Sequence, residues 1–273
     1  MPHIHMIRRG AVGTITIDRP AHFNSLDVHT AQDFRRAGLQ YARDDGVRVV
    51  VLRGLPTMFC SGADLKFIRD GGDGGGLGYL APGAARGGYG ERFKQILEYI
   101  HSTISEIRRA PKPFIAAVDG VAAAGGFGIA MSCDLVLAST RASFEWAYSK
   151  TGLTGAESST FLLPRLIGLR RAMELMLLNP RLAATQAHDY GLVTAVYDVD
   201  RFDDAVAGVA DQLAAGPQRA FAIAKELLNQ SAGFDRLDAH LDREIQELAR
   251  AADGPEFAQG LAAFFEKRPA TFV

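Results

Sequence analysis

AAVDGVAAAGGFGIAMSCD, residues 116–134, is the stretch that decides the fold of this chain. It begins within an apolar run at 113–118 that predicts a buried strand. After Asp119-Gly120 the chain enters a series of small residues that predicts a helix starting near Gly125. A buried strand that leads directly into a helix of small residues is typical of an α/β protein whose helices pack closely on a sheet.

Strand-like and helix-like segments alternate on both sides of this stretch. We predict strands at 12–18, 47–54 and 134–138, and helices at 27–43 and 92–109. Because strands that alternate with helices usually pair in parallel, this part of the chain predicts an α/β fold.

The last third of the chain has a different pattern, which is almost wholly helical from about residue 156. Gly216 and Pro217 precede the run AFAIAKELLNQ and form a start signal for a helix. We therefore expect a core over residues 1–200 that contains the site, and a C-terminal helical region over residues 201–273.

A glycine-rich segment interrupts the regular pattern, since ten of the twenty residues from 71 to 90 are glycine. Such a segment buries too little surface to offset its ordering entropy. This favours a mobile loop, which is either a disordered insertion or a flap that orders over a substrate. It contains no G-x-G-x-x-G match and so does not indicate a phosphate-binding loop.

The composition argues against several classes of protein. With 30 basic and 31 acidic residues, the formal net charge is −1, which gives no reason to expect nucleic acid or an anionic membrane as a partner. No run approaches about 18 uninterrupted apolar residues, so we expect no membrane span. The two cysteines, Cys60 and Cys133, fit a reducing compartment, and the first ten residues lack the apolar core of a signal peptide. We expect a cytoplasmic globular protein without a metal site.

Two segments are suited to chemistry. The turn SGAD at 61–64 precedes a predicted helix, and Gly125-Gly126 opens another. The first amides of a helix lack internal partners and carry the positive end of its dipole, while glycine lets a ligand approach closely. Two such amides that converge would stabilise an oxygen that gains negative charge. Each segment alone also fits simple close packing of a helix on a sheet.

Taken together, the two segments resemble those of the crotonase (enoyl-CoA hydratase/isomerase) family. The resemblance covers nearly the whole chain and rests on residues 19–26, SGAD at 61–64, AAVDGVAAAGG at 116–126, Cys133-Asp134, LPRLIG at 163–168 and YGLVTAVY at 190–197. It implies a spiral of ββα units with C-terminal helices, assembled as a trimer or as a hexamer formed from two trimers.

The resemblance also implies a site for an acyl-CoA thioester, with coenzyme A as part of the substrate and no separate cofactor. The two donors to the thioester oxygen would be the backbone amides of Ala63 and Gly125. Further contacts to the coenzyme A portion would come from these residues: Phe23, Asn24, Ser61, Ala63, Asp64, Leu65 and Lys267.

The chain departs from the family at its acids. Hydratases of the family use two glutamates, but Gly128 and Tyr148 stand at the matching positions. A third acid position, found in some isomerases and in 4-chlorobenzoyl-CoA dehalogenase, matches Ala156, and Glu157 follows it directly. Because a one-residue shift in this loop is structurally cheap, we expect Glu157 to act as a base on the α or γ carbon. The alternative is a carboxylate that favours the start of a helix.

The likeness to the dehalogenase extends to two more positions. Its histidine matches His101, and its tryptophan next to the halide matches Tyr148. A histidine can titrate near neutral pH, so His101 is a second candidate acid or base, although it also fits a packing residue on an amphipathic helix.

Three functions stay open on the sequence. The first is enoyl-CoA isomerisation, or hydration by an altered set of acids, through a stabilised thioester enolate. The second is thioester hydrolysis or an aryl-CoA dehalogenase-like reaction, with Glu157 or His101 activating water. The third is a non-catalytic acyl-CoA binder that lacks the two usual glutamates.

Overall fold

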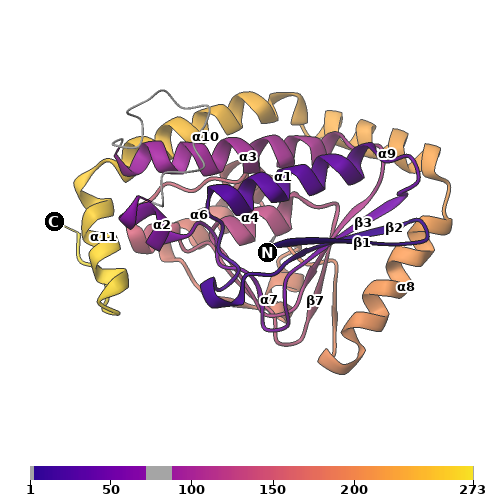
Figure 1. The fold of residues 1–273 in the computed structure, drawn as a ribbon, viewed down its shortest axis with the longest axis horizontal. Coiled ribbons are helices and arrows are strands. Elements are labelled where there is room, and N and C mark those ends of the chain that lie inside the picture. The colour runs from indigo at the N-terminus through magenta and orange to yellow at the C-terminus, as the bar shows by residue number, and fades with distance from the viewer. Residues whose placement is uncertain (1–2, 72–87, 273) are drawn as a thin grey trace.

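The computed structural model describes residues 3–71 and 88–272, which form two sheets surrounded by helices (Figure 1). The larger sheet has the strand order β1-β2-β3-β5-β7-β10 and the smaller one the order β4-β6-β8-β9. Among the strand pairs of the described residues, β1–β2 and β8–β9 are antiparallel and the others are parallel. The larger sheet consists of β1 Ile4–Arg9, β2 Val12–Ile17, β3 Val49–Arg53, β5 Phe114–Val118, β7 Leu135–Ser139 and β10 Ala195–Tyr197. The smaller sheet consists of β4 Met58–Cys60, β6 Val121–Ala123, β8 Ser143–Glu145 and β9 Leu182–Ala183.

The connection between the sheets repeats along the chain. In each of three successive units, one strand joins the larger sheet and the next joins the smaller sheet: β3 and β4, then β5 and β6, then β7 and β8. Helical segments follow each pair, so the chain forms a spiral of ββα units. This confirms the predicted fold class.

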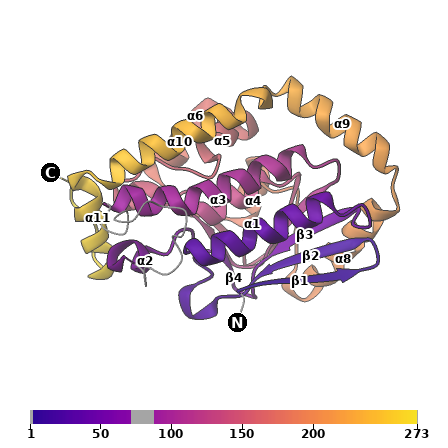
Figure 2. The same cartoon turned by 45° about the horizontal axis from the view of Figure 1, so that its top comes forward.

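Eleven α-helices are found in the described residues. They are α1 Val28–Arg43, α2 Leu65–Asp70, α3 Tyr89–Arg109, α4 Gly125–Ser132, α5 Ser159–Ile167, α6 Leu169–Leu178, α7 Ala184–Asp189, α8 Phe202–Ala215, α9 Gln218–Ser231, α10 Leu237–Ala252 and α11 Pro255–Phe265. Helix α3 runs beside α1 on one side and α10 on the other, as both views show (Figure 2). None of these helices is long and apolar enough to cross a membrane.

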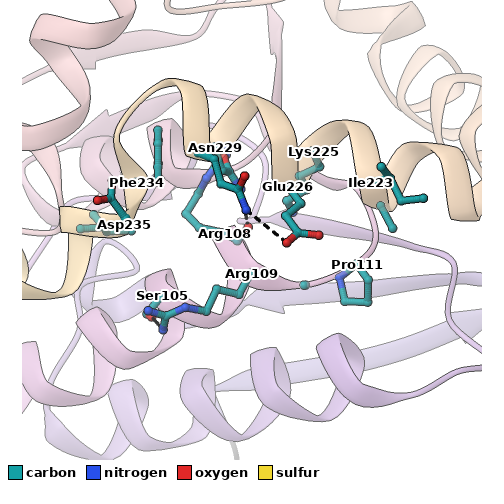
Figure 3. A pocket seen from close by; sticks show the side chains of 14 residues that line it. Ser105, Arg108, Arg109, Pro111, Ile223, Lys225, Glu226, Asn229, Phe234 and Asp235 are labelled. Carbon is teal, nitrogen blue, oxygen red and sulfur yellow. Dashed lines mark hydrogen bonds between the residues drawn. The ribbon is translucent and has the colours of Figure 1, made fainter.

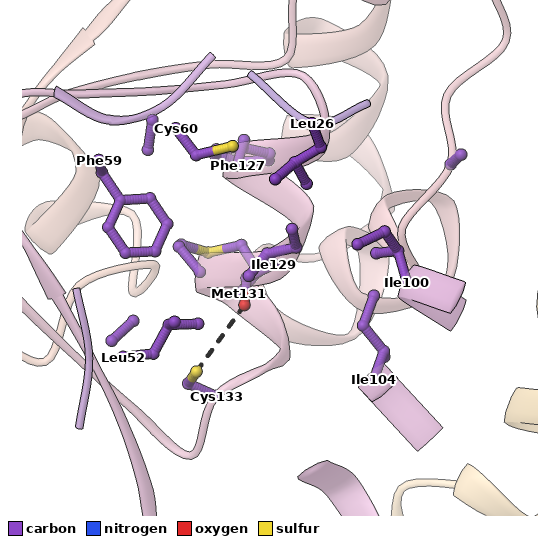
Figure 4. Packing of buried hydrophobic residues seen from close by; sticks show 14 of the residues in the cluster. Leu26, Leu52, Phe59, Cys60, Ile100, Ile104, Phe127, Ile129, Met131 and Cys133 are labelled. Carbon is purple, nitrogen blue, oxygen red and sulfur yellow. Dashed lines mark hydrogen bonds between the residues drawn. The ribbon is translucent and has the colours of Figure 1, made fainter. Parts of the chain in front are cut away.

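Helix α4 lies at the centre of the core. All eight of its residues are buried, and side chains from three directions surround it, among them Leu26, Phe59 and Ile104 (Figure 4). The close approach depends on glycine, because a Cβ on Gly126 would lie only 2.0 Å from the carbonyl oxygen of Cys60. The small residues of this stretch are therefore required by packing, whatever else they do.

The structure corrects part of the secondary-structure prediction. The stretch after residue 156, expected to be almost wholly helical, contains β9 and β10. They have two and three residues, which is too short for a hydrophobic period to show in the sequence. The prediction of a mobile loop falls mostly on residues 72–87, which lie outside the described residues.

The C-terminal helices α8–α11 pack on the preceding residues rather than apart from them. Helix α8 contacts β3, α10 lies along α3, and α11 contacts the 3-10 helix η3, Tyr148–Thr151. The C-terminal region thereby reaches the residues predicted to form the site. The division of the chain near residue 200 stays a prediction.

Candidate active site

The turn at 61–64 is held by a bridge to Leu26. The amide of Leu26 donates to the carbonyl of Gly62 (2.8 Å), and the amide of Asp64 donates to the carbonyl of Leu26 (2.9 Å). Because successive amides of an extended segment point to opposite sides, the amide of Ala63 points away from Leu26. Within the described residues, no acceptor takes a hydrogen bond from that amide.

The second turn brings Gly125 to the same place. Ala124 has φ 47° and ψ −119°, and Gly125, the first residue of α4, has an amide with no partner inside the helix. A Cβ on Gly62 would lie 2.8 Å from the Cβ of Ala124 and 3.0 Å from the nitrogen of Gly125. The two turns are therefore in contact, and the Gly125 amide is likewise unbonded within the described chain.

A small cavity of about 120 Å³ opens where the two turns meet. Its polar or backbone side is formed by Ser61, Ala63, Ala124, Gly125, Tyr148, Lys150, Thr151 and Glu157. Its apolar side includes Leu65, Phe93, Leu97, Leu153, Leu248 and Phe264. The structure therefore gathers six of the predicted site residues around one cavity, and the last two apolar residues come from the C-terminal helices α10 and α11.

The carboxyl group of Glu157 lies against Gly125. A Cβ on Gly125 would be 2.7 Å from Oε1 of Glu157, and the hydroxyl of Tyr148 donates a hydrogen bond to Oε2. Burial raises the pKa of Glu157 to about 8, although the hydrogen bond from Tyr148 opposes this rise. A carboxyl group with such a pKa can both accept and donate a proton near neutral pH.

Gly128 and Tyr148, where the sequence comparison above expects the hydratase glutamates, both contact Glu157. A Cβ on Gly128 would lie 2.5 Å from the carbonyl oxygen of Glu157 and 2.7 Å from its Cβ, so the main chain of Glu157 occupies the space that a side chain at 128 would need. Tyr148, at the other position, is the hydrogen-bond partner of the carboxylate. The departures at 128 and 148 thus accommodate Glu157.

Glu157 does not serve as a cap for helix α5. The amides of Ser158 and Thr160 at its start donate instead to the carboxylate of Glu244, at 2.9 and 3.1 Å. Sequence reasoning missed Glu244. The available signal was a charged residue within the apolar stripe of α10, where Leu237, Leu241, Glu244 and Leu248 recur at helical spacing.

His101 contacts the main chain of Glu157 and does not line the cavity. Its Nε2 accepts a hydrogen bond from the amide of Glu157 at 3.0 Å, and its Nδ1 lies 3.2 Å from the carbonyl oxygen of Leu241. Since a carbonyl only accepts, Nδ1 carries the proton and the ring is neutral. Burial lowers the pKa of His101 to about 4, in agreement with this tautomer. Both ring nitrogens are engaged within the fold.

Two of the predicted coenzyme A contacts, Asn24 and Asp64, have structural roles. The side chain of Asn24 is fully buried, donates to the carbonyls of Ile17 and Met58 and accepts from the amide of Arg19. These bonds engage its side chain within the fold, and its contact to coenzyme A stays a prediction. The buried carboxylate of Asp64 caps α2 and pairs with Arg19, whose guanidinium and hydrogen bonds hold the pKa of Asp64 low against its burial.

The remaining predicted contacts lie at the surface. The ring of Phe23 is 66% exposed, and Lys267 is exposed just beyond α11. In the described part of the chain, no group of three or more His, Cys, Asp or Glu side chains is placed to hold a metal ion.

A second hollow, of about 580 Å³, lies between α3 and α9 and contains none of the predicted residues (Figure 3). Its cationic side chains have partners within the fold: Arg108 bonds to Asn229, and Lys225 donates to Asp134 and to main-chain carbonyls. It therefore lacks the unpaired, converging polar groups of the smaller cavity.

Comparisons with known proteins agree with this fold. The family model described as enoyl-CoA hydratase/isomerase matches residues 8–273. The chain is 35% identical over 265 residues to 1,2-epoxyphenylacetyl-CoA isomerase of Escherichia coli strain K12, covering 96% of this chain and 95% of the relative. It is 31% identical over 265 residues to 4-chlorobenzoyl coenzyme A dehalogenase-2 of an Arthrobacter species, covering 97% and 91%.

A solved structure gives the same result. The crystal structure of an enoyl-CoA hydratase from Mycobacterium avium subsp. paratuberculosis K-10 superposes with a TM-score of 0.86 at 32% identity, covering 99% of this chain and 98% of the other. Fold and cavity thus define a crotonase-type α/β protein. The chain belongs to the enoyl-CoA hydratase/isomerase family, and the relatives named above are acyl-CoA enzymes.

Proposed function

We propose that this protein moves a proton on an acyl-CoA thioester through an enolate, in the manner of an enoyl-CoA isomerase. The observation that carries the proposal is the carboxyl group of Glu157, which lies against Gly125 in the cavity shared with Ala63. One carboxyl group and two unbonded amides thus border the same small space.

In the proposed reaction, the thioester oxygen accepts hydrogen bonds from the amides of Ala63 and Gly125. The ionised carboxylate of Glu157 takes a proton from the α or γ carbon, and the C–H electron pair moves into a dienolate whose negative charge rests on the thioester oxygen. Glu157 then returns the proton to the other carbon, and the double bond shifts without any other reactant. Each amide donor is worth roughly 3–4 kcal/mol in such a transition state.

The number of acids favours isomerisation over hydration. Hydration requires one group to activate water and a proton donor for the α carbon, whereas isomerisation needs a single carboxyl group that both accepts and donates. Glu157 is the carboxyl group that lines the described cavity, and its pKa of about 8 suits both steps.

The coenzyme A portion of the bound substrate would extend from the cavity past Ser61 and Leu65 to the surface, where Phe23 and Lys267 would contact it. These four residues line the cavity or are exposed to solvent. We further propose that the protein is a cytoplasmic trimer or dimer of trimers, as the family resemblance implies.

Deuterium exchange in D₂O tests the proposal. Several acyl-CoAs are incubated with the protein, and mass and free thiol are followed together. Deuterium is expected at the α carbon, with no release of coenzyme A thiol, and Glu157→Gln should abolish the exchange. Exchange at the full rate in Glu157→Gln would exclude Glu157 as the base.

The similarity to 4-chlorobenzoyl coenzyme A dehalogenase-2 makes a second function worth testing. Here Glu157 would have to attack an aryl carbon, because Ala156 carries no carboxyl group. Release of halide from 4-chlorobenzoyl-CoA would support this alternative, and release of thiol would support hydrolysis. Binding of acyl-CoA without any of these reactions would identify a non-catalytic binder.

A further inference from the structure

The main chain at Glu157 has an uncommon conformation. Glu157 has φ 49° and Ser158 has φ 60°, so two consecutive non-glycine residues lie in the left-handed region. Residues with a side chain rarely adopt this conformation, and it persists only where surrounding contacts over-determine it. Something in the structure must therefore hold this turn.

Three main-chain amides of the turn are held by two side chains from distant helices. His101 of α3 accepts from the amide of Glu157 at 3.0 Å. Glu244 of α10 accepts from the amides of Ser158 at 2.9 Å and Thr160 at 3.1 Å. All these bonds are buried or half-buried, so little water competes for them.

The two acceptors also lie close together, and His101 is fixed to the helix that carries Glu244. Nδ1 of His101 lies 3.2 Å from the carbonyl of Leu241 on α10, and Nε2 lies 3.8 Å from Oε2 of Glu244. Both side chains are about 4% exposed. Because α3 and α10 run side by side (Figures 1 and 2), the pair sits between two helices that pack along their lengths.

Neither His101 nor Glu244 lines the cavity, and neither contacts the carboxylate of Glu157 through a hydrogen bond. Both act on the backbone of the turn. The main-chain conformation sets the direction in which the Glu157 side chain leaves the turn, and Tyr148 then bonds to its carboxylate.

We propose that His101 and Glu244 are positioning residues, which hold the left-handed turn at 157–158 so that the carboxylate of Glu157 faces the amides of Ala63 and Gly125. This inference rests on the proposed function for its kinetic consequence. In this proposal His101 accepts a hydrogen bond from the main chain and does not act as an acid or base.

The experiment compares two substitutions of the same residue. In His101→Gln, an oxygen can take the place of Nε2 and accept from the Glu157 amide, whereas His101→Leu has similar bulk and no acceptor. We expect His101→Leu to lower the rate of α-deuterium exchange about 100-fold, as a shift of about 1 Å can do, with the KM for acyl-CoA changed less than about twofold. His101→Gln should recover most of the rate. Equal loss in both variants would overturn the proposal, because a ring that transfers protons cannot be replaced by glutamine.

Glu244→Gln provides the second arm, since one carboxylate oxygen becomes an amide nitrogen that cannot accept. The matched control is Ser105→Ala, which removes another hydrogen bond between α3 and α10, from Ser105 to Asp238. Glu244→Gln is expected to slow exchange with little change in KM, and Ser105→Ala is expected to lower thermal stability without slowing exchange. An equal slowing in both would assign the effect to helix packing and overturn the proposal.

A readout independent of activity separates this inference from the proposed function. The side-chain carboxyl of Glu157 can be titrated by carbon-13 NMR in each variant. We expect its midpoint to fall towards the ordinary range in His101→Leu but to stay near the wild-type value in His101→Gln. If the wild type exchanges no deuterium yet the titration follows this pattern, the proposed function fails and the positioning role stands. If the midpoint is the same in all variants, the positioning role fails.

Discussion

The hydroxyl of Tyr148 donates a hydrogen bond to the carboxylate of Glu157. The family resemblance predicts that Tyr148 and Gly128 stand where hydratases carry their two glutamates. In this chain both positions serve the glutamate at 157, one as its donor and one by leaving room for its main chain.

Tyr148→Phe removes that donor and leaves the ring in place. Because the hydrogen bond favours the ionised carboxylate, its loss should raise the pKa of Glu157 further above 8, by roughly one unit. The pH profile of α-deuterium exchange should move to higher pH by that amount. A midpoint that moves to lower pH would show that Tyr148 disfavours the ionised form.

Glu157 should lower the stability of the protein in alkaline solution. Its pKa is 4.5 ordinarily and about 8 in the fold, so between these values the folded state binds more protons than the unfolded state. Stability therefore falls as pH rises through this window. The free energy of unfolding of Glu157→Gln, taken relative to that of the wild type, should therefore rise between pH 5 and pH 9. The rise should be on the order of 3 kcal/mol, since one pKa unit corresponds to about 1.4 kcal/mol.

Urea unfolding of both proteins at the two pH values measures this difference, and the effects of other groups cancel in the comparison. If the difference in unfolding free energy between Glu157→Gln and the wild type is the same at pH 5 and pH 9, Glu157 titrates normally in the folded protein.

His101 has the opposite dependence. Its pKa is lowered to about 4, against 6.5 ordinarily, so the unfolded state binds more protons between these values. The contribution of neutral His101 to the stability of the fold is complete above pH 6.5 and is lost as pH falls towards 4. His101→Gln should therefore unfold at a lower pH than expected from its stability at pH 7, as acid titration followed by circular dichroism would show. An unchanged acid transition would contradict a neutral buried ring.

Gly128→Ala should disturb Glu157 directly. The added Cβ would lie 2.5 Å from the carbonyl oxygen of Glu157, so the turn must move, at a cost of about 1–3 kcal/mol in unfolding free energy. Exchange should be slowed more than overall stability explains. Gly208→Ala in α8 is the matched control, because no atom lies within 4 Å of its added Cβ. This variant should raise the free energy of unfolding by about 0.5–1 kcal/mol.

The size of the cavity predicts a preference for compact acyl groups. Its volume of about 120 Å³ is slightly below the roughly 150 Å³ of an engineered protein cavity that binds benzene. We expect four-carbon or single-ring acyl-CoAs to bind at least tenfold tighter than palmitoyl-CoA, measured by calorimetry. Phe264→Ala, which shortens a lining side chain, should reduce the ratio of the two affinities. Equal binding of all chain lengths by the wild type would contradict the predicted preference.

The sequence alone determined the alternation of strands and helices and the two turns around Ala63 and Gly125. These features follow from local requirements: hydrophobic period, helix start signals, and glycine where backbones approach within contact distance. The family resemblance singled out Glu157, because Ala156 matches an acid position of some members and Glu157 follows it directly in a loop of small residues. It could not show that the main chain of Glu157 fills the space beside Gly128.

Tertiary structure alone decided what Asn24, His101 and Glu244 do. Asn24 matched a family position on the ligand path, yet it is buried and bonded to three segments of the fold. His101 and Glu244 lie more than a hundred residues apart and meet at one turn. A hydrogen bond depends on the distance between atoms in space, whereas a sequence pattern records only spacing along the chain. Which polar side chains hold the fold and which face a substrate was therefore settled by packing.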